Sequence, residues 1–392
     1  GSGSVGRIMV DIYHTLEEHG DSPLIAYGRQ RAPEGLLAYR FGTGADMALH
    51  VLSTFFRGEH GFASAGQTRR LITKIREWDP DVIHLHNIHG FVLQVELLFE
   101  YLKTAGKPVV WTLHDCWAYT GHCAFYEYHR CSGWKTGCRD CREYQNTYPY
   151  ALFKNRTERN YIRKRAAFTN VPDLTLAVPS VWLEREVKQS FLGDYPVKVI
   201  PNGIDLAGFH PVEKGLRERL GLTGRYVILG VANVWERRKG LDYFVELSRR
   251  LPEDCQVILI GLTGRQKRRL PERMLGISRT SSVEELAEYY SMADVFVNGT
   301  LEDNFPTTNL EALACGTPVI TFDTGGSPES LTEACGRVVP KGDVEALTRA
   351  VLKERQEPKS RDACLQRAER YKKEDRFLEY AELYHELAGR RG

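Results

Sequence analysis

The chain has 392 residues, enough for two domains of ordinary size, and 42% of them are hydrophobic, which allows a sizeable core in each. Its 53 Lys and Arg residues nearly balance its 51 Asp and Glu residues, so the net charge of +2 excludes a general attraction to nucleic acid. No apolar run approaches the ~20 residues of a membrane span, and no signal peptide is recognisable, so we expect a cytoplasmic protein.

The chain opens with the glycine-rich sequence GSGSVG, and apolar residues then recur at helical spacing as far as Leu16. This pattern predicts a helix that begins at about Ser4. Gly1, Gly3 and Ser4 would then form a glycine-rich loop at the helix N-terminus, where backbone amides favour an anion.

A histidine-rich sequence, DPDVIHLHNIHG, predicts a buried strand over residues 82–85. His84 and His86 lie on one face of that strand, which would allow them to chelate a metal ion. No further ligand follows at a standard spacing, so we favour a strand end that opens on a cleft, with His86 and Asn87 in its loop.

A second strand, predicted over residues 108–113, ends at His114 and leads into a cysteine-rich segment, residues 116–141. Four cysteines of this segment have the spacing C-x7-C-x6-C-x2-C, which suits a structural zinc ion in a reducing compartment: Cys123, Cys131, Cys138 and Cys141. Free thiols or a disulfide pair are the alternatives, because no common zinc finger has this spacing. The aromatic residues of the segment suit either stacking on a ligand or packing of the segment itself.

The pattern of residues 150–168 predicts a basic helix, in which Lys and Arg are interleaved with aromatic and aliphatic residues. Such a helix suits a peripheral contact with the anionic inner face of a membrane. A solvated helix face is the alternative.

A turn at Asn202-Gly203 marks the end of the first domain, which we place at residues 1–205, with the second domain at residues 206–392. Apolar residues at helical spacing near the C-terminus predict one amphipathic helix over about residues 361–390.

The second domain begins with a strand over residues 226–231, which the sequence ANVWERRKG follows. Gly261 ends the next strand, and its missing side chain allows a close approach of the backbone to a ligand.

The sequence NGTLEDNFPTTNLEALACGTPVIT, residues 298–321, carries the strongest signal. A buried strand leads into a polar loop and then into a helix that Thr307 or Thr308 caps, so the amides at the helix start suit a phosphate. Asp303 and Glu311 flank this anion site, and carboxylates accept hydrogen bonds from sugar hydroxyls. The sequence therefore predicts a ligand that contains both a diphosphate and sugars.

The spacing D-x7-E, followed by A-L-A-C-G-T-P-V-I, resembles the E-x7-E signature of the retaining glycosyltransferases of the large GT-B family called family 4. The resemblance covers nearly the whole chain and is strongest over residues 81–87, 111–117, 196–205 and 226–340. It implies an α/β fold of the GT-B type, with two doubly wound, Rossmann-like domains facing across a cleft and the C-terminal helix crossing back to the first domain. The first strand of the family has no counterpart here, so we expect a first-domain sheet that lacks one strand.

The resemblance also implies roles for particular residues. In the family the first acid of the signature contacts the transferred sugar. It is Asp303 here, shorter than the usual Glu, and Glu302 beside it is a possible substitute. The second acid, Glu311, contacts the nucleotide ribose, and Lys239 matches the lysine that holds the donor diphosphate.

Asn233 stands where the family has a second diphosphate-binding residue, an arginine, and Arg237 or Arg238 would supply the missing charge, because a guanidinium group suits phosphate. His114 matches a family histidine that approaches the transferred sugar, which makes His114, Asp303 and Lys239 the candidate catalytic residues. The implied donor-binding set is Asn233, Arg238, Lys239, Gly261, Ile277, Asp303, Asn304, Phe305, Pro306, Thr307, Thr308 and Glu311. The implied acceptor and phosphate loops contain Gly1, Gly3, Ser4, His86 and Asn87.

The implied reaction transfers a sugar from a UDP- or GDP-type donor to a hydroxyl of a glycan or lipid-linked acceptor in cell-surface polysaccharide assembly, with retention of configuration. No DxD motif is present, so we expect no cofactor or metal in catalysis. Two alternatives stay open. The first is a sugar-nucleotide epimerase or hydrolase that uses His114 with Asp115 as acid and base. The second is a non-catalytic sugar-nucleotide-binding subunit, which the change to Asn233 favours.

Overall fold

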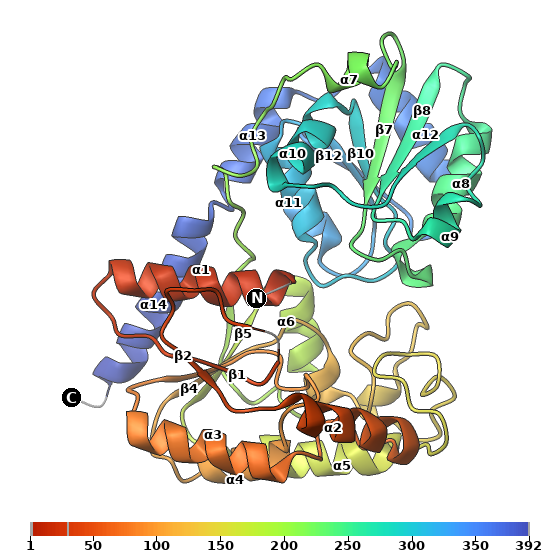
Figure 1. Cartoon of the computed structure of the whole chain (residues 1–392). Coiled ribbons are helices and arrows are strands. Elements are labelled where there is room, and N and C mark those ends of the chain that lie inside the picture. Colours follow the sequence, from red (N-terminus) through yellow and green to blue (C-terminus); the bar gives the residue numbers. More distant parts are fainter. Residues whose placement is uncertain (1–2, 30, 391–392) are drawn as a thin grey trace. The chain divides into compact units, whose positions relative to one another are not determined.

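The structure is a computed structural model, which describes residues 3–29 and 31–390 of the chain. The chain forms two compact units (Figure 1). Unit 1 contains the residues up to Pro201 together with those from Arg376 onward, and unit 2 contains Asn202–Asp375. Across the described ranges, none of the helices combines the length and the apolar character that crossing a lipid bilayer requires.

Unit 1 is built on a parallel sheet with the strand order β3-β4-β5-β6. These strands are β3 (Ile83–Leu85), β4 (Val109–Thr112), β5 (Leu174–Val178) and β6 (Val197–Val199). A separate parallel pair contains β1 (Ile25–Tyr27) and β2 (Ala38–Arg40). Every residue of β4 and β5 is buried, because helices cover both faces of the sheet.

Alternate residues of β4 point to opposite faces of the sheet. Val109 and Trp111 pack in the core formed with α3 (Ala65–Trp78), α4 (Val95–Leu102), α5 (Thr157–Phe168) and α6 (Val181–Lys188). Val110 packs on the other face with α1 (Ser4–Glu18) and α14 (Lys373–Gly389). The last helix of the chain therefore completes the core of unit 1 (Figure 1). One more helix of this unit, α2, spans Gly44–Arg57.

The cysteine-rich segment contains only two short 3-10 helices, η1 (Trp117–Tyr119) and η2 (Gly133–Lys135). Trp117, Tyr119 and Trp134 are almost completely buried. These aromatic rings pack the segment against unit 1, so of the two roles predicted for them the packing role is the one that the structure shows.

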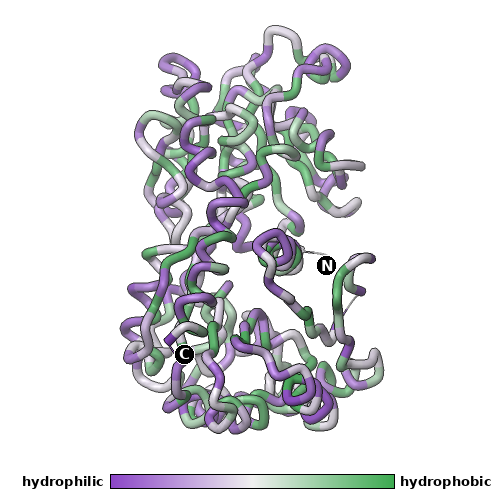
Figure 2. Tube along the Cα trace, turned by 90° about the vertical axis from the view of Figure 1, so that its left-hand side faces the viewer, coloured by the Kyte–Doolittle hydropathy of each residue, from purple (hydrophilic) through white to green (hydrophobic). Residues whose placement is uncertain are grey.

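Unit 2 is built on a six-stranded parallel sheet with the order β12-β11-β10-β7-β8-β9. Its strands are β7 (Tyr226–Val231), β8 (Cys255–Ile260), β9 (Met274–Ile277), β10 (Val295–Asn298), β11 (Val319–Phe322) and β12 (Gly336–Val339). Its helices are α7 (Leu216–Arg219), α8 (Leu241–Arg250), α9 (Gly264–Lys267), α10 (Val283–Met292), α11 (Thr307–Ala314), α12 (Val344–Gln356) and α13 (Arg361–Glu369), with 3-10 turns η3 (Arg237–Lys239) and η4 (Ser327–Ser330). Colouring by hydropathy shows hydrophilic and hydrophobic stretches alternating along the helices, as expected of helices with one buried face (Figure 2).

Two sequence-based boundaries differ from the structure. The single helix predicted over 361–390 is two helices, α13 in unit 2 and α14, because the chain breaks at Tyr371. The Tyr371 carbonyl accepts from the Ile204 amide at 2.7 Å, and the Ile204 carbonyl accepts from the Lys373 amide at 3.0 Å. The basic helix predicted over 150–168 begins only at Thr157.

Unit 1 also buries histidines that must stay uncharged. His50, His60 and His122 are at most 3% exposed. Burial lowers the pKa of His50 and of His122 to about 4, and that of His60 well below its usual value. The hydrogen bonds of His50 also fit a neutral ring, because its Nε2 accepts from the Gly61 amide at 3.1 Å while its Nδ1 contacts the Ser64 hydroxyl at 2.8 Å. A second ring proton would oppose the Gly61 N–H.

We expect the stability of the fold to fall as the pH drops from 6.5 toward 4. The unfolded chain binds protons with a histidine pKa near ~6.5, whereas the folded chain resists them until about pH 4 at His50 and His122. Each such histidine therefore lowers the free energy of unfolding by about 1.4 kcal/mol for every pH unit below 6.5, down to about pH 4. Above pH 6.5 the ring is neutral in both states, and its full contribution to stability is present. Urea unfolding between pH 4.5 and 7.5 measures the slope. His50→Gln should flatten it, and His14→Gln, which changes an exposed histidine, should leave it unchanged. Equal midpoints at pH 5 and 7 would contradict the expectation.

Candidate functional site

The topology of unit 2 gathers its polar loops at one edge of the sheet. The chain builds β7, β8 and β9 toward one side and then returns to place β10 on the other side of β7. In such sheets ligands bind at the carboxyl ends of the strands where the order reverses. The loops after β7 and β10 meet at this point, and they carry Lys239 and Asp303.

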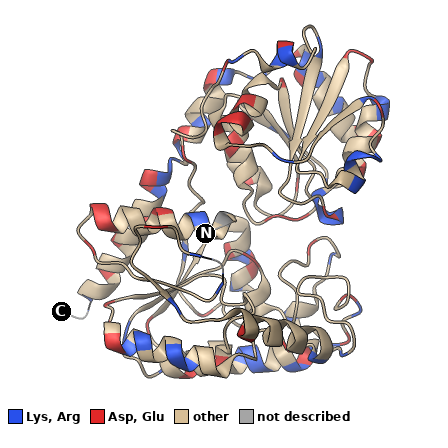
Figure 3. Cartoon of the chain, in the orientation of Figure 1, with Lys and Arg blue, Asp and Glu red and all other residues tan. Residues whose placement is uncertain are grey.

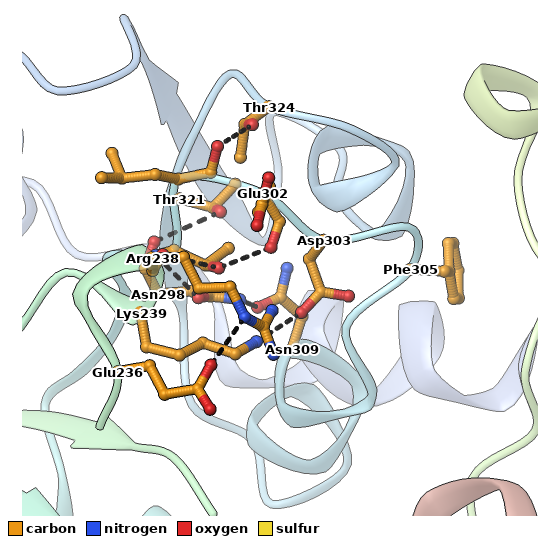
Figure 4. Close-up of polar contacts among 12 residues, drawn as sticks. Glu236, Arg238, Lys239, Asn298, Glu302, Asp303, Phe305, Asn309, Thr321 and Thr324 are labelled. Atoms are coloured by element: carbon orange, nitrogen blue, oxygen red, sulfur yellow. Dashed lines mark hydrogen bonds and ion pairs between the residues drawn. The ribbon is translucent and has the colours of Figure 1, made fainter. Parts of the chain in front are cut away.

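Lys239 and Asp303 form an ion pair across the two loops. The Lys239 Nζ lies 2.6 Å from Asp303 Oδ2, and each side chain keeps about a fifth to a quarter of its surface exposed: 24% and 21%. The two groups point toward one another in Figure 4. A ligand can therefore reach both charges, and it would meet a cation and an anion side by side.

Main-chain contacts hold these loops together. The Leu301 amide donates to the Arg238 carbonyl at 2.7 Å. Gly240 has a positive φ of 76°, and a Cβ there would lie 2.0 Å from the Gly299 carbonyl oxygen. Only glycine allows the turn that carries Lys239 to come this close to the loop after β10.

The loop after β11 fixes the backbone of Asp303 from the other side. The Gly326 amide donates to the Asp303 carbonyl at 3.1 Å, and a Cβ on Gly325 would lie 1.8 Å from the same oxygen. The Thr324 hydroxyl donates to the Leu301 carbonyl at 2.8 Å. Three loops, after β7, β10 and β11, thus set the position of one carboxylate (Figure 4).

The helix that follows, α11, begins at Thr307 with Pro306 as its N-cap residue, and no side chain of the described structure caps it. The expected cap by Thr307 or Thr308 is therefore wrong. The first amides of a helix lack partners within the helix. An uncapped start beside Lys239 leaves these donors for an anionic ligand.

Glu311 lies one turn further along α11 and is only 6% exposed. Its Oε2 accepts from the buried Tyr290 hydroxyl of α10 at 2.9 Å, which fixes the orientation of the carboxylate. Asn304 is 4% exposed, and Phe305 packs against Tyr371 with ring centroids 5.6 Å apart. The Phe305 ring lies apart from the Lys239–Asp303 pair in Figure 4, so its side chain belongs to the core.

The other residues that the sequence predicted to bind the sugar nucleotide differ in exposure and in their contacts. Asn233 is exposed, and Arg238 Nε lies 3.0 Å from Glu236 Oε2. Gly261 has a φ of 99°, and a Cβ there would meet the Ala232 carbonyl oxygen at 1.6 Å. The Ile277 carbonyl accepts from the Gly261 amide at 3.0 Å, so this oxygen already has a hydrogen-bond partner in the main chain.

Two residues that sequence reasoning missed support the site from beneath. The Trp235 Nε1 donates to the Ile260 carbonyl at 2.8 Å and anchors the loop after β7. Asn309, fully buried on α11, accepts from Asn298 Nδ2 at 2.8 Å and donates to the Ser330 hydroxyl at 2.9 Å. An asparagine within an otherwise apolar helix face is the signal that could have revealed it.

In unit 1 the structure brings His86 and His114 together, as the neighbouring strands β3 and β4 predict. The His114 Nε2 lies 2.9 Å from His86 Nδ1, and His86 Nε2 lies 3.2 Å from His84 Nδ1. Burial lowers the pKa of His114 to about 4 and of His84 to about 3, so both rings are neutral at pH 7. Asn87 is exposed beside them.

The N-terminal loop is only partly described. Gly1 lies outside the described residues. Gly3 precedes α1 with a φ of 101°, and its carbonyl accepts from the Arg7 amide at 3.2 Å. Ser4 is the first residue of the helix, as the periodicity predicted.

The four cysteines of the C-x7-C-x6-C-x2-C spacing lie near one another. Burial, and then the charges of Cys138, Cys131 and Cys141, raise the pKa of the Cys123 thiol. The Gly121 amide donates to Cys138 Sγ at 3.1 Å and the Gly133 amide to Cys131 Sγ at 3.4 Å. None of the four forms a disulfide. Over residues 3–29 and 31–390, no three His, Cys, Asp or Glu side chains are grouped so that they would hold a metal ion, and this applies to the histidines of β3 as well.

Lys and Arg residues lie along the basic helix α5 (Figure 3), and several of them are paired or buried within unit 1. Arg163 donates to both oxygens of Glu96, at 2.7 and 2.6 Å, and Arg156 pairs with Glu59. Lys164 is completely buried, and its Nζ donates to the carbonyls of Trp117 and Thr120. The helix therefore stabilises unit 1 and the cysteine-rich segment, and it does not present a continuous basic face.

Solved structures of known proteins share this fold. Sucrose-phosphate synthase from Thermosynechococcus elongatus superposes with a TM-score of 0.75 at 20% identity, covering 98% of this chain and 94% of its own. Anabaena HepE, solved in complex with UDP-glucose, superposes with a TM-score of 0.69 at 15% identity, covering 99% and 97%. At these identities the likeness shows the fold, which is the GT-B fold of two Rossmann-like α/β units.

The family follows from the sequence profiles. The family described as "Glycosyltransferase Family 4" matches residues 5–207, which is more than half of the chain, and the one described as "Glycosyl transferases group 1" matches residues 225–354. The chain belongs to glycosyltransferase family 4 and is a glycosyltransferase of the GT-B type.

Two curated relatives are similar to this chain. The putative colanic acid biosynthesis glycosyl transferase WcaC of Escherichia coli is 26% identical over 295 residues, which are 72% of this chain and 69% of the relative. A GDP-mannose-dependent monoacylated phosphatidylinositol monomannoside mannosyltransferase of Corynebacterium glutamicum is 29% identical over 203 residues, 46% of this chain and 52% of the relative. The chain thus spans about two thirds of the first relative and about half of the second.

Proposed function

We propose that the chain transfers a sugar from a nucleoside-diphosphate sugar to a hydroxyl of a glycan or lipid-linked acceptor, with retention of configuration and without a catalytic metal ion. The observation that carries the proposal is the Lys239–Asp303 pair beside the uncapped start of α11. A cation, free amides and a carboxylate at one edge of a sheet match a diphosphate joined to a sugar.

The site divides its work between the two parts of such a donor. Lys239 and the amides of Thr307 and Thr308 hold the diphosphate, and they stabilise the negative charge that develops on it as the sugar leaves. Asp303 exchanges its contact with Lys239 for hydrogen bonds from sugar hydroxyls. Glu311, which Tyr290 orients, accepts from the ribose hydroxyls.

His114 belongs to unit 1 and is neutral at pH 7, because burial lowers its pKa to about 4, so it offers a hydrogen-bonding group to a substrate hydroxyl. UDP- and GDP-type donors are the ones to test, because HepE is solved with UDP-glucose and the Corynebacterium relative is GDP-mannose-dependent. Names of the two relatives point to polysaccharide and glycolipid acceptors.

A panel of UDP-, GDP- and ADP-sugars tests the reaction. We expect one donor to release free nucleoside diphosphate slowly by itself and rapidly when an acceptor from an anionic polysaccharide or glycolipid fraction is added. An isomerised sugar nucleotide formed without acceptor would identify an epimerase instead, and binding without turnover would identify a non-catalytic subunit.

Lys239→Ala and Glu311→Gln should each weaken binding of the accepted nucleoside diphosphate roughly 10- to 100-fold, because each removes a charge-assisted hydrogen bond worth about 1.5–3 kcal/mol. Glu311→Gln keeps an oxygen for the Tyr290 hydroxyl, so the fold is preserved. Isothermal calorimetry measures the dissociation constants. Lys353→Ala is the matched control, because it removes an exposed lysine of α12. Unchanged affinity in both site variants would place the donor elsewhere.

We also propose a peripheral contact with an anionic lipid surface, at a place other than the one predicted from the sequence. Large apolar side chains lie exposed on α2 and on the segment beside it, and we call them the α2 apolar surface: Leu49, Leu52, Phe56, Leu152 and Phe153. The Phe56 and Phe153 rings stack with centroids 5.3 Å apart, and the exposed Arg57 and Lys154 flank them. Apolar groups beside basic ones favour the boundary of an anionic bilayer.

Leu52→Ser combined with Phe153→Ser should reduce binding to vesicles of phosphatidylglycerol and phosphatidylcholine at least about tenfold, because each buried apolar side chain contributes roughly 1.5–3 kcal/mol. Flotation of the full chain with the vesicles measures it. Val338→Ser, at an exposed apolar residue of unit 2, is the control. Wild-type protein that stays with the unbound fraction would refute the contact.

A structural zinc ion at Cys123, Cys131, Cys138 and Cys141 remains a proposal. The hydrogen bonds from the Gly121 and Gly133 amides to sulfur support it, because amide donors stabilise a thiolate more than a thiol. Burial raises the pKa of Cys138 to about 11, so these sulfurs need a cation in order to ionise. The side chains would have to turn toward one another to bind the ion.

Elemental analysis of the purified chain should find about one zinc ion per molecule. Cys138→Ser should lose it, and Cys255→Ser, at a buried cysteine of unit 2, should keep it. Metal-free wild-type protein with all nine thiols titratable after unfolding would exclude the zinc ion, and a deficit of four thiols would show disulfides instead.

A further inference from the structure

A continuous chain of hydrogen-bonding groups runs through unit 1 from α14 to His114. The Thr112 hydroxyl donates to Tyr380 Oη at 3.1 Å, and His84 Nε2 lies 2.7 Å from Thr112 Oγ1. His84 Nδ1 contacts both the Tyr384 hydroxyl and His86 Nε2. His86 Nδ1 in turn contacts His114 Nε2 at 2.9 Å. Three contacts, from Thr112 to His84, from His84 to His86 and from His86 to His114, therefore connect a threonine of β4 with the histidine that follows the same strand.

The direction of the first hydrogen bond determines the direction of all the others. A threonine hydroxyl has one proton, and Thr112 gives it to Tyr380, so its oxygen accepts the proton of His84 Nε2. A neutral imidazole carries only one N–H. His84 Nδ1 is then an acceptor and takes hydrogen bonds from the Tyr384 hydroxyl and from His86 Nε2.

The same rule applies at each following ring. Because His86 carries its proton on Nε2, its Nδ1 is an acceptor, and the proton between His86 and His114 belongs to His114 Nε2. The argument requires neutral rings. Burial, together with the neighbouring histidines, lowers the pKa of His84 to about 3, of His114 to about 4 and of His86 well below its usual value.

We propose that Thr112, through His84 and His86, is a positioning residue that sets the tautomer of His114, so that His114 carries its proton on Nε2 and has an acceptor at Nδ1. The inference rests on the proposed function for the meaning of that acceptor, which would receive a hydrogen bond from a substrate hydroxyl. The chain of contacts itself stands on unit 1 alone.

The C-terminal helix is part of this device. Tyr380 takes the Thr112 proton, Tyr384 donates to His84, and both tyrosines are buried on α14. These residues lie 268 and 300 positions away in the sequence from their partners. Helix α14 therefore does more than fill the core of unit 1. Its Tyr380 hydroxyl accepts the Thr112 proton, and this hydrogen bond sets the direction of the others.

Thr112→Val tests the proposal. Valine has the shape of threonine without the hydroxyl, so a proton on His84 Nε2 would lose the acceptor that Thr112 provides. The proton then moves to His84 Nδ1, His86 takes Nδ1–H, and His114 takes Nδ1–H. Long-range ¹H–¹⁵N correlation spectra of histidine-labelled full chain at pH 7, assigned with single histidine variants, distinguish these forms.

We expect Nε2–H on His84, His86 and His114 in the wild type and in Thr112→Ser, and Nδ1–H on all three in Thr112→Val. The control is Thr175→Val, which changes a buried threonine of the neighbouring strand β5. Wild-type rings with Nδ1–H, or Thr112→Val rings that keep Nε2–H, would overturn the inference whatever the activity.

Activity provides the second measurement. Thr112→Val should lower kcat roughly 10- to 100-fold with little change in KM for the donor, because a hydrogen-bonding group of the wrong tautomer cannot serve the transition state. Thr112→Ser should restore it, which a merely structural role in the strand would not require. If the tautomers reverse and kcat does not change, the chain of contacts is correct and the role proposed for His114 is wrong.

Discussion

The ion pair between Lys239 and Asp303 is the interaction on which the candidate site depends. Its two residues come from loops 64 positions apart, and main-chain hydrogen bonds and two glycines that tolerate no side chain hold those loops together. A carboxylate next to an ammonium group keeps both charges partly desolvated at little cost before a ligand arrives. A diphosphate could bind the ammonium group while sugar hydroxyls donate to the carboxylate. The charges of the unliganded pair would then already be complementary to the two parts of the proposed donor.

A different constraint governs unit 1, which buries titratable groups and keeps them neutral. The rings of His50, His84, His86 and His114 contact one another, hydroxyls or a backbone amide, whereas neither nitrogen of the buried His60 ring has a hydrogen-bond partner among the described residues. His89 instead lies 2.8 Å from the Asp115 carboxylate. Lys164 follows the same pattern, because burial lowers the pKa of its amino group, whose Nζ donates to two carbonyls and lies over the Trp117 ring. Such networks require each proton to have one defined position, so Thr112 would influence the tautomer of His114 through the two histidines between them in the network.

Local sequence was informative wherever one short stretch carried the whole signal. The strand, loop and helix of residues 295–314 follow from an apolar run, turn-forming residues and a helical apolar face, and β7 was predicted with its observed bounds. The prediction failed where a distant contact decided the outcome. The helix expected over 361–390 breaks at Tyr371 because its carbonyl pairs with Ile204, and the basic face expected over 150–168 is largely neutralised by Glu59 and Glu96. Residues far apart in the sequence make these contacts, so periodicity could not reveal them.

The amino-acid sequence by itself determined the class of fold and the family signature at Asp303 and Glu311, and it marked Lys239 as a predicted phosphate-binding residue, because these depend on residue type and short spacing. Only the tertiary structure decided which polar side chains contact one another. It paired Lys239 with Asp303, oriented Glu311 through Tyr290, and connected Thr112 to His114 through two other histidines. Hydrogen bonds and ion pairs act only over a few ångströms, so partners separated by tens or hundreds of residues are set by how the chain folds back on itself.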